Sequence, residues 1–487
     1  MNRELSAKWA SMALVLSMTA CGGGGGGSSP PVAAAPAPIA QTPAPGPSAP
    51  APAPAPSAPA PAPTPSAPAP TPSAPAPAPG PAPAPGPASP APAPAPAPSG
   101  VQSGALGQFG PEALASGIAP AANLKQSSAA ARLAGGGAVI AWTSGTSLMA
   151  QQLDAAGNAV AAPQTVGDIG SATLAEHAAF AVAATADGGW VAVWASSSNT
   201  VQFRRYASSS SPIGAATAAD TTQFPQIVSV DAQALADGGF VVGWAASASA
   251  SGTPQAFVRR FGSDGGAISG TASVSGVAGA QSDLHLSTPA GGGLLAAWVQ
   301  TSADGTTFSI VARRFDASLN PLTTEIVLQT QPLTTRGPFD LAVASDADGT
   351  SIVAWAQESS VSWQVVGNDG TPVGAAGSTS VNASMLVDTV RATPRASGYT
   401  LVAESTLASS RSTSGTINLF TVDASGTLQS TLDLGQRTLF TVSPTTGDSC
   451  GPSPSGVAAA GGADGRYVLA YESCTGAQSS QLQVVAP

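Results

Sequence analysis

Seven copies of one motif follow residue 120, and each contains an apolar strand that ends in tryptophan or in a replacement for it. Successive copies of this terminal residue lie 49 to 67 positions apart. The strands end at Trp142, Trp194, Trp244, Trp298, Trp355, Glu404 and Tyr471. A repeat of this length is one supersecondary unit that cannot bury its apolar surface alone. The repeat therefore restricts this part of the chain to an array of stacked units.

A glycine-rich turn precedes most of these strands, as in Asp187-Gly188-Gly189 and Asp237-Gly238-Gly239. Asp-Gly between apolar runs predicts a tight hairpin, in which a type I′ turn needs positive φ. Both alternating sets of residues in the strand 190–194 are apolar, which predicts burial on both faces. Four-stranded sheets with this pattern are typical of propeller blades, whereas a β-helix needs a shorter period and tandem sandwiches a longer one. We predict an all-β, seven-bladed β-propeller over residues 100–487.

The hairpin, the strand ending in tryptophan and a following Arg-Arg-aromatic strand together resemble bacterial propeller repeats of the Kelch-like length class, across residues 120–487. This resemblance implies a fold and no particular function. The last repeat shows strands near 456–461, 467–471 and 481–485 and lacks a fourth. Because folded proteins avoid a long unpaired apolar edge, we predict that residues 101–120 supply the missing strand, most specifically Ala105–Phe109.

The first twenty residues carry Arg3 and Lys8, a short apolar run and small residues before Cys21, an order typical of a secretory signal. SMTAC followed by glycine resembles the lipobox of bacterial lipoproteins, with Met18 where leucine is commoner. The resemblance implies a signal peptide over 1–20 and lipidation of Cys21. Because Gly22 rather than aspartate follows, it also implies the outer membrane, on its periplasmic face or at the cell surface. An ordinary secretory signal with an incidental cysteine is the alternative.

Residues 21–99 are largely glycine and then Ala-Pro repeats, and no charged residue lies between Lys8 and Glu112. Alternate prolines remove amide donors and fix φ, so neither helix nor sheet can form. Residues 21–99 are predicted to be a disordered tether. Its Ala-Pro stretch from Pro30 to Pro98 should have extended polyproline II character and reach on the order of 200 Å at ~3.1 Å per residue.

Charge and composition exclude several functions. The formal net charge is −10, and the only lysines are Lys8 and Lys125, which argues against a nucleic-acid partner. The chain has two histidines, His177 and His285, and so has little material for a histidine-based metal site. We expect neither a metal nor another cofactor.

Two motifs lie in the last repeat. Gly447–Gly451 fits the G-x-S-x-G pattern of serine hydrolases, but a nucleophile elbow needs a following helix and histidine, so we interpret Ser449 as a loop residue. Cys450 and Cys474 would both reach an oxidising compartment after export. We therefore predict a disulfide between them.

Three arginine pairs occupy neighbouring repeats and suggest either a cationic stripe or packing between blades. Because successive strand residues point to opposite faces, we predict that one arginine of each pair packs near a tryptophan. Asp346-Ala347-Asp348-Gly349 resembles the start of a calcium loop but lacks the further ligands, so we predict a hairpin turn. The pairs are Arg204-Arg205, Arg259-Arg260 and Arg313-Arg314.

Ionisable residues on the predicted first strands would line the channel of a propeller. Aligning the repeats by tryptophan places Asp283 and Asp340 at equivalent positions of neighbouring blades, where a carboxylate pair could perform acid–base chemistry. Solvated polar groups without catalytic function are the interpretation that we favour. The residues are Glu176, His177, Asp231, Asp283, His285 and Asp340, and the candidates for a site are His177, Asp283, His285 and Asp340.

The sequence thus indicates a membrane-anchored envelope lipoprotein whose propeller binds or scaffolds an envelope glycan or protein without catalysing a reaction. The alternative is a propeller enzyme that acts on glycans through channel carboxylates. A purely structural role in the envelope is a third possibility. Clustering of the channel candidates within about hydrogen-bond reach would favour the enzyme.

Overall fold

The computed structural model divides the chain into two units, Met1–Ala95 and Pro96–Pro487. Every residue that the structure describes lies in the second unit, so the predictions for residues 1–99 fall outside the described residues. The described residues are 115–118, 128–144, 146–155, 159–169, 179–249, 251–333, 340–407, 415–437, 457–462, 467–474 and 480–485.

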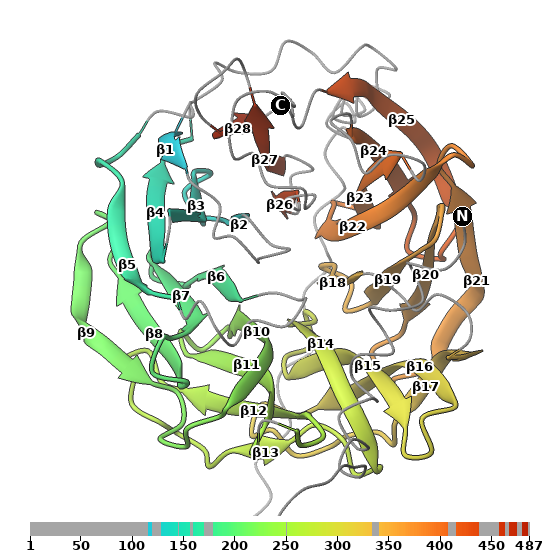
Figure 1. Ribbon diagram of the computed structural model, residues 1–487, viewed down its shortest axis with the longest axis horizontal. Helices are drawn as coiled ribbons and strands as arrows, with labels where there is room; N and C mark the ends of the chain where they lie inside the picture. Colours follow the sequence, from blue (N-terminus) through green and yellow to red (C-terminus); the bar gives the residue numbers. More distant parts are fainter. Residues whose placement is uncertain are drawn as a thin grey trace, which may run out of the picture. The chain divides into compact units, whose positions relative to one another are not determined.

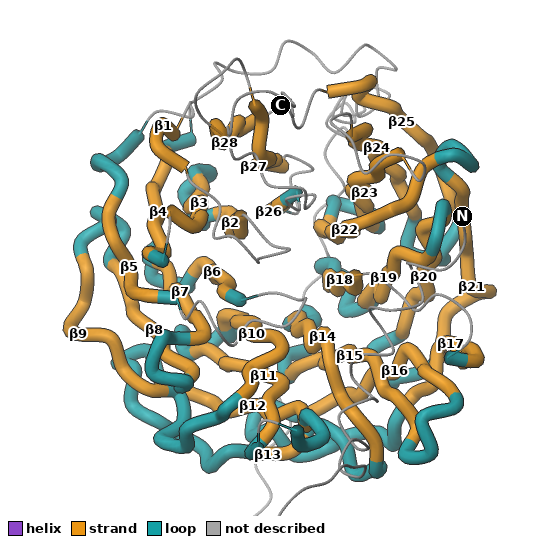
Figure 2. Tube along the Cα trace, in the orientation of Figure 1, coloured by secondary structure: helices purple, strands orange, loops and turns teal. Residues whose placement is uncertain are grey.

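The described residues form an all-β structure of seven four-stranded antiparallel sheets. The sheets are arranged like propeller blades around a common centre, with the first strand of each innermost (Figure 1). Strands and loops make up all of the described chain (Figure 2), and within it no helix is long and apolar enough to cross a bilayer. The prediction of an all-β, propeller-like arrangement is confirmed.

Each sheet runs from an inner first strand to an outer fourth strand. The first strands are β2 Ser128–Arg132, β6 Phe180–Ala184, β10 Gln226–Ala234, β14 Gly279–Ser287, β18 Asp340–Ser345, β22 Met385–Pro394 and β26 Ala458–Gly461. The second strands are β3 Ala138–Ser144, β7 Trp190–Ala195, β11 Phe240–Ser247, β15 Leu294–Ser302, β19 Ser351–Gln357, β23 Tyr399–Leu407 and β27 Tyr467–Cys474.

The third and fourth strands complete each sheet towards the outside. The third strands are β4 Ser147–Leu153, β8 Val201–Tyr206, β12 Gln255–Phe261, β16 Thr307–Phe315, β20 Ser360–Val366, β24 Gly415–Val422 and β28 Ser480–Val485. The fourth strands are β5 Gln164–Asp168, β9 Pro212–Ala218, β13 Ala272–Ser273, β17 Ile326–Pro332, β21 Pro372–Ser380, β25 Leu428–Arg437 and, in the last sheet, β1 Ala115–Ile118.

The second strands whose burial is fully described, β7, β11, β15 and β19, are buried on both faces over most of their length, as the sequence predicts. All residues of β7 and β11 are buried, and Trp190 and Trp244 are wholly enclosed. Burial of a large apolar side chain contributes roughly 1.5–3 kcal/mol, so these strands dominate the packing. Because each face is covered by a different neighbouring sheet, a strand of this kind can bury all its apolar side chains only between two sheets of a stack.

The turn between the first and second strands of the second sheet differs from the predicted type I′ geometry. In the second sheet the amide of Gly188 donates to the carbonyl of Thr185, and of the turn residues Gly188 alone has a positive φ, +83°. Asp187 instead accepts a hydrogen bond from the amide of Gly189 through its Oδ1, at 3.1 Å. The Asp-Gly-Gly sequence therefore builds a longer loop in which the aspartate braces the turn and the first glycine takes the left-handed conformation. The turn at Asp346 follows the same plan, which confirms the predicted hairpin there.

The last sheet is closed by the N-terminal segment of the second unit. Strand β1 pairs antiparallel with β28, with Ala115 opposite Leu482 and Ile118 opposite Ser480. Pairing from within residues 101–120 is confirmed, but the position is wrong: the strand is Ala115–Ile118, and Ala105–Phe109 lies outside the described residues. The structure thus joins the two ends of the array without a covalent link.

Closure by β1 predicts a clear difference between two deletions of equal length in the full chain. Removing 115–118 exposes the edge of β28, and we expect the free energy of unfolding to fall on the order of 3 kcal/mol, with a Tm several degrees lower. Removing 105–108 is the matched control and should leave the Tm unchanged. Thermal unfolding followed by circular dichroism measures both, and equal Tm values would show that β1 does not close the ring.

Candidate functional site

The inner strands surround a cavity of about 160 Å³ at the centre of the ring. Most of the side chains around it are small, because alanines from six of the seven first strands face it. A second hollow of about 340 Å³ continues along the same strands and shares six lining residues with the first, among them Gln233 and Ala392. The ionisable residues that line the first cavity are Asp231, His285 and Arg391. The result is a narrow cavity lined largely by alanine, into which three neighbouring ionisable groups project.

Asp231 and His285 hold the same place in neighbouring sheets. Asp231 pairs with Gly243 and His285 pairs with Ala297, which in each case is the residue before the tryptophan of the second strand. Side chains in one register position of adjacent sheets face each other around the axis. The Nδ1 atom of His285 accordingly lies 3.7 Å from Oδ2 of Asp231.

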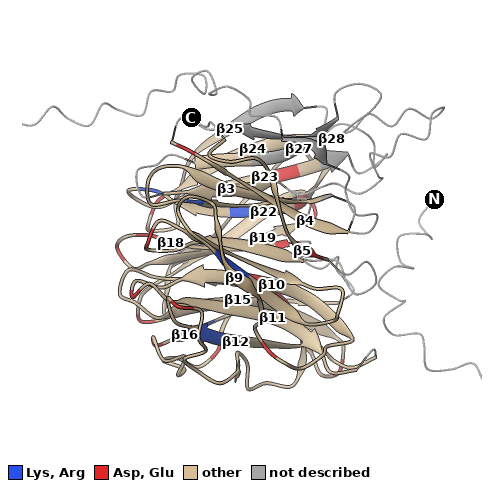
Figure 3. Cartoon of the chain, turned by 90° about the vertical axis from the view of Figure 1, so that its left-hand side faces the viewer, with Lys and Arg blue, Asp and Glu red and all other residues tan. Residues whose placement is uncertain are grey.

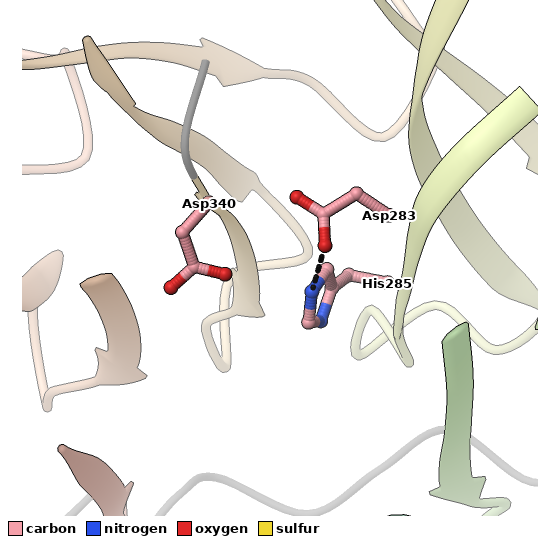
Figure 4. A group of neighbouring side chains, drawn as sticks. All are labelled: Asp283, His285 and Asp340. Carbon is pink, nitrogen blue, oxygen red and sulfur yellow. Dashed lines mark ion pairs between the residues drawn. The ribbon is translucent and has the colours of Figure 1, made fainter. Parts of the chain in front are cut away.

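Asp283 reaches His285 from the same strand, two positions earlier in the sequence. The pairing of β14 with β15 is irregular between Ser282 and His285, and Asp283 has a φ of +53°. The carboxylate of Asp283 points towards the imidazole of His285 at this irregularity, and its Oδ1 lies 3.4 Å from Nε2 of His285 (Figure 4). A non-glycine residue with positive φ is uncommon, and such residues cluster at functional sites.

Asp340 approaches this pair from the next sheet. Ligand-type atoms of Asp283, His285 and Asp340 all lie within 4.8 Å of one another. Oδ2 of Asp340 accepts a hydrogen bond from the amide of Val390 at 2.9 Å and forms an ion pair with Arg391. The predicted equivalence of Asp283 and Asp340 thus corresponds to neighbouring side chains.

The protonation of this cluster is set by burial and by mutual charge. Burial raises the pKa of Asp340, against the attraction of Arg391, and the neighbouring charge of Asp283 raises it further. Burial likewise raises the pKa of Asp231, opposed by His285. For His285, burial favours the neutral ring, but the close approach and charge of Asp283, with the charges of Asp231 and Asp340, outweigh it and raise the pKa.

Carboxylates in this region also connect neighbouring sheets. Oδ2 of Asp231 accepts the amide of Leu286 at 2.7 Å, just as Asp340 accepts that of Val390. The interpretation of the channel candidates as solvated groups is wrong for Asp283 and Asp340, which are 1% and 9% exposed. Their burial is possible because each finds partners on its own or an adjacent strand.

Some sequence candidates cannot be placed and one functional residue was missed. Glu176, His177, Ser449 and Cys450 lie outside the described residues, and the side chain of Cys474 is not described, so the disulfide stays a prediction.

Arg391 was overlooked, although it precedes Glu404 by 13 residues, the same interval that separates Asp231 and His285 from their tryptophans. That shared interval is the signal that could have identified it.

The first arginine of each pair packs in the way expected, but on a different ring. The guanidinium groups of Arg204, Arg259 and Arg313 lie 5.6 to 5.8 Å from the ring centres of Tyr206, Phe261 and Phe315. The predicted contact with a tryptophan is therefore wrong: the partner is the aromatic residue two positions on, because side chains at i and i+2 share a face of a strand.

The second arginine of each pair binds a polar side chain in a turn. Arg205 and Arg260 form ion pairs with Asp187 and Asp237 of the hairpin turns in their own sheets. The fourth sheet has glycine in place of that aspartate, and Arg314 instead donates to Asn368 in the turn of the next sheet. Charged residues are sparse along the strands (Figure 3), and these six guanidinium groups have structural partners rather than forming a free cationic stripe.

Glu404 takes the place of tryptophan in the sixth sheet and is wholly buried. Its Oε2 accepts the amide of Val457 in the seventh sheet at 3.0 Å and the hydroxyl of Thr389 at 3.3 Å. Burial, with the nearby charge of Asp388, raises the pKa of Glu404 to about 8. The carboxyl group is thus protonated near neutral pH and holds the last sheet through a neutral hydrogen-bonded contact.

Comparisons with protein-family models and with curated proteins yield no match. Among solved structures, the polysaccharide lyase Uly1 is similar with a TM-score of 0.48 and 11% identity, covering 79% of this chain and 94% of the lyase. An ulvan lyase of the PL25 family bound to -[GlcA(1-4)Rha3S]- has a TM-score of 0.47 and 6% identity, covering 77% and 94%. The six-bladed fungal lectin of Aleuria aurantia has a TM-score of 0.39 and 12% identity, covering 63% and 96%. With every score below 0.5, none of these likenesses bears on function.

Glu404 predicts a specific pH dependence of stability. The unfolded chain ionises this group near pH 4.5, whereas the folded chain keeps its proton to about pH 8. The stabilising contribution is therefore complete below pH 4.5 and is lost as pH rises to about 8. Glu404→Gln cannot ionise, so relative to wild type it should gain stability between pH 5 and pH 8, on the order of a few kcal/mol.

Chemical denaturation of both proteins at pH 5 and pH 8 measures this difference. Glu358→Gln, at an exposed turn, is the matched control and should track wild type at both values. If Glu404→Gln and wild type differ by the same amount at the two pH values, the folded protein does not retain the proton.

Proposed function

We propose that this chain is a bacterial envelope lipoprotein whose seven-bladed β-propeller binds or scaffolds an envelope ligand without catalysing a reaction. Residues 1–20 would be the signal peptide, Cys21 the lipid-bearing residue, 21–99 the disordered tether and 100–487 the propeller. The lipobox-like SMTAC and the Ala-Pro repeats support the anchor and the tether. The seven sheets and the pairing of β1 with β28 support the propeller. Several acyl chains on one cysteine would give stable attachment to the outer membrane.

One observation carries the binding function: the buried carboxylates of the channel are engaged in holding the sheets together. Asp340 accepts an amide of the next sheet and pairs with Arg391, and Asp231 accepts an amide and faces His285. A general acid or base must reach a proton of the substrate, whereas Asp283 and Asp340 are almost fully shielded. The ionisable residues that do line the cavity, Asp231, His285 and Arg391, are held in place by these contacts and are therefore suited to present a fixed polar wall to a ligand. A saccharide or a polypeptide loop from an envelope partner has the hydroxyl or amide groups to bind such a wall.

A glycan-degrading enzyme is the second candidate, favoured by the close approach of Asp283, His285 and Asp340. Burial raises the pKa of Asp340, and a carboxyl group with a raised pKa is the kind that acts as a general acid in glycan cleavage. This function needs an opening of the channel that brings substrate to the buried carboxylates.

Substitution at Cys21 tests the anchor. Cys21→Ser removes the thiol that would carry the lipid, so the variant should incorporate no labelled fatty acid and should leave the membrane fraction. Metabolic labelling and fractionation of wild type and variant measure this. Cys474→Ser, as control, should remain labelled and membrane-bound. Label that persists on Cys21→Ser would exclude the lipoprotein assignment.

Binding of the purified full-length protein to an envelope glycan and protein panel separates the two candidate functions. We expect at least one ligand that is retained unchanged in mass and is bound at least tenfold more weakly by Arg391→Gln. Arg395→Gln, in the turn between β22 and β23, is the matched control and should bind as wild type. Release of new glycan ends by wild type but not by Asp340→Asn would instead establish the enzyme.

A further inference from the structure

Three side chains that can each ligate a metal ion point towards one another (Figure 4). They are Asp283, His285 and Asp340. The atoms lie within 4.8 Å, and Nε2 of His285 is 3.4 Å from Oδ1 of Asp283. A direct hydrogen bond between such groups is about 2.7–3.2 Å long. Zinc bonds of about 2.0–2.2 Å place neighbouring ligand atoms of a tetrahedral ion roughly 3.4 Å apart. The separation is that of two ligands of one ion.

The Nε2 atom of His285 is a second and independent indication. This atom is sealed from solvent, and it has no hydrogen-bond partner among the described residues. A buried polar atom without a partner is costly and calls for an explanation. A cation between Nε2 and the two carboxylates would satisfy it, because a neutral imidazole nitrogen is one of the commonest metal ligands in proteins.

Two of the three candidate ligands, His285 and Asp340, contact further polar groups that would orient them, as ligands in known metal sites do. Nδ1 of His285, the nitrogen on the far side of the ring, faces Oδ2 of Asp231 at 3.7 Å. Asp340 is held by the amide of Val390 and by Arg391. A carboxylate behind a ligand histidine and hydrogen bonds behind a ligand carboxylate orient the ligands and raise metal affinity. Residues of β10 and β22 thus support ligands from β14 and β18.

We propose that Asp283, His285 and Asp340 bind one divalent transition-metal ion of the zinc type. One imidazole and two carboxylates suit such an ion better than calcium, which takes six to eight oxygen ligands. Three protein ligands leave a fourth position for a water molecule or another small ligand, and the ring of His285 borders the central cavity. The site departs from the expectation of no metal, and it does not depend on the lipid anchor or on the proposed envelope ligand.

Zinc titration of the EDTA-dialysed full-length protein by calorimetry tests the site. Wild type should bind one Zn²⁺ per chain, and Ca²⁺ and Mg²⁺ should compete poorly. His285→Gln and Asp340→Asn should each weaken zinc binding at least tenfold. His177→Gln removes the other histidine of the chain and Asp304→Asn removes an exposed turn carboxylate, and both should bind as wild type. Cobalt loaded in place of zinc should give visible d–d absorption in wild type that His285→Gln loses.

Circular dichroism shows whether each variant is folded. Asp340→Asn keeps an oxygen acceptor for the amide of Val390 and is the milder change, so it decides the matter if His285→Gln does not fold. The proposal is overturned if wild type binds no zinc at micromolar concentrations. It is equally overturned if folded Asp340→Asn binds as wild type, or if binding follows His177 instead of His285.

Discussion

Burial of the second strands on both faces is the constraint on which the rest of this structure depends. A strand such as Trp190–Ala195 has no face that can be left to water, so it must lie between two neighbouring sheets. A linear stack would satisfy this need everywhere except at its two ends. Pairing of β1 with β28 completes the last sheet from the other end of the array, so the ring follows from the burial of its strands.

Closing the ring places the seven first strands around one axis and brings residues from distant repeats together. Asp231, Asp283, Asp340 and Arg391 come from four sheets, yet they contribute to one cluster around His285. Asp231 and Asp340 also accept amides of the adjacent first strands, so two of the groups that define the candidate site connect the sheets. Glu404 makes a similar connection between the sixth and seventh sheets. A change in the channel is therefore also a change in the stability of the fold.

The repeat predicted the strands, the burial of the tryptophans and the neighbouring positions of Asp283 and Asp340, because all of these depend on local periodicity. It failed where the outcome depends on contacts between repeats. Short stretches such as 105–109 and 115–118 carry no strong periodicity, so the closing strand could not be located from its own residues. Arg391 was missed as a site residue, and Glu404 as a contact between sheets, because their partners, Asp340 and Val457, lie about fifty positions away. Burial of the channel aspartates likewise depends on those partners.

Hydrogen exchange measured by mass spectrometry on the full-length protein tests the closed ring most directly. If β1 and β28 complete the last sheet, peptides from β27 and β28 should exchange as slowly as those from β7 and β11 and should open in the same cooperative event. Fast exchange of β27 and β28, while the amides of β7 and β11 remain protected, would show an open array that frays at its end. That result would contradict closure of the ring.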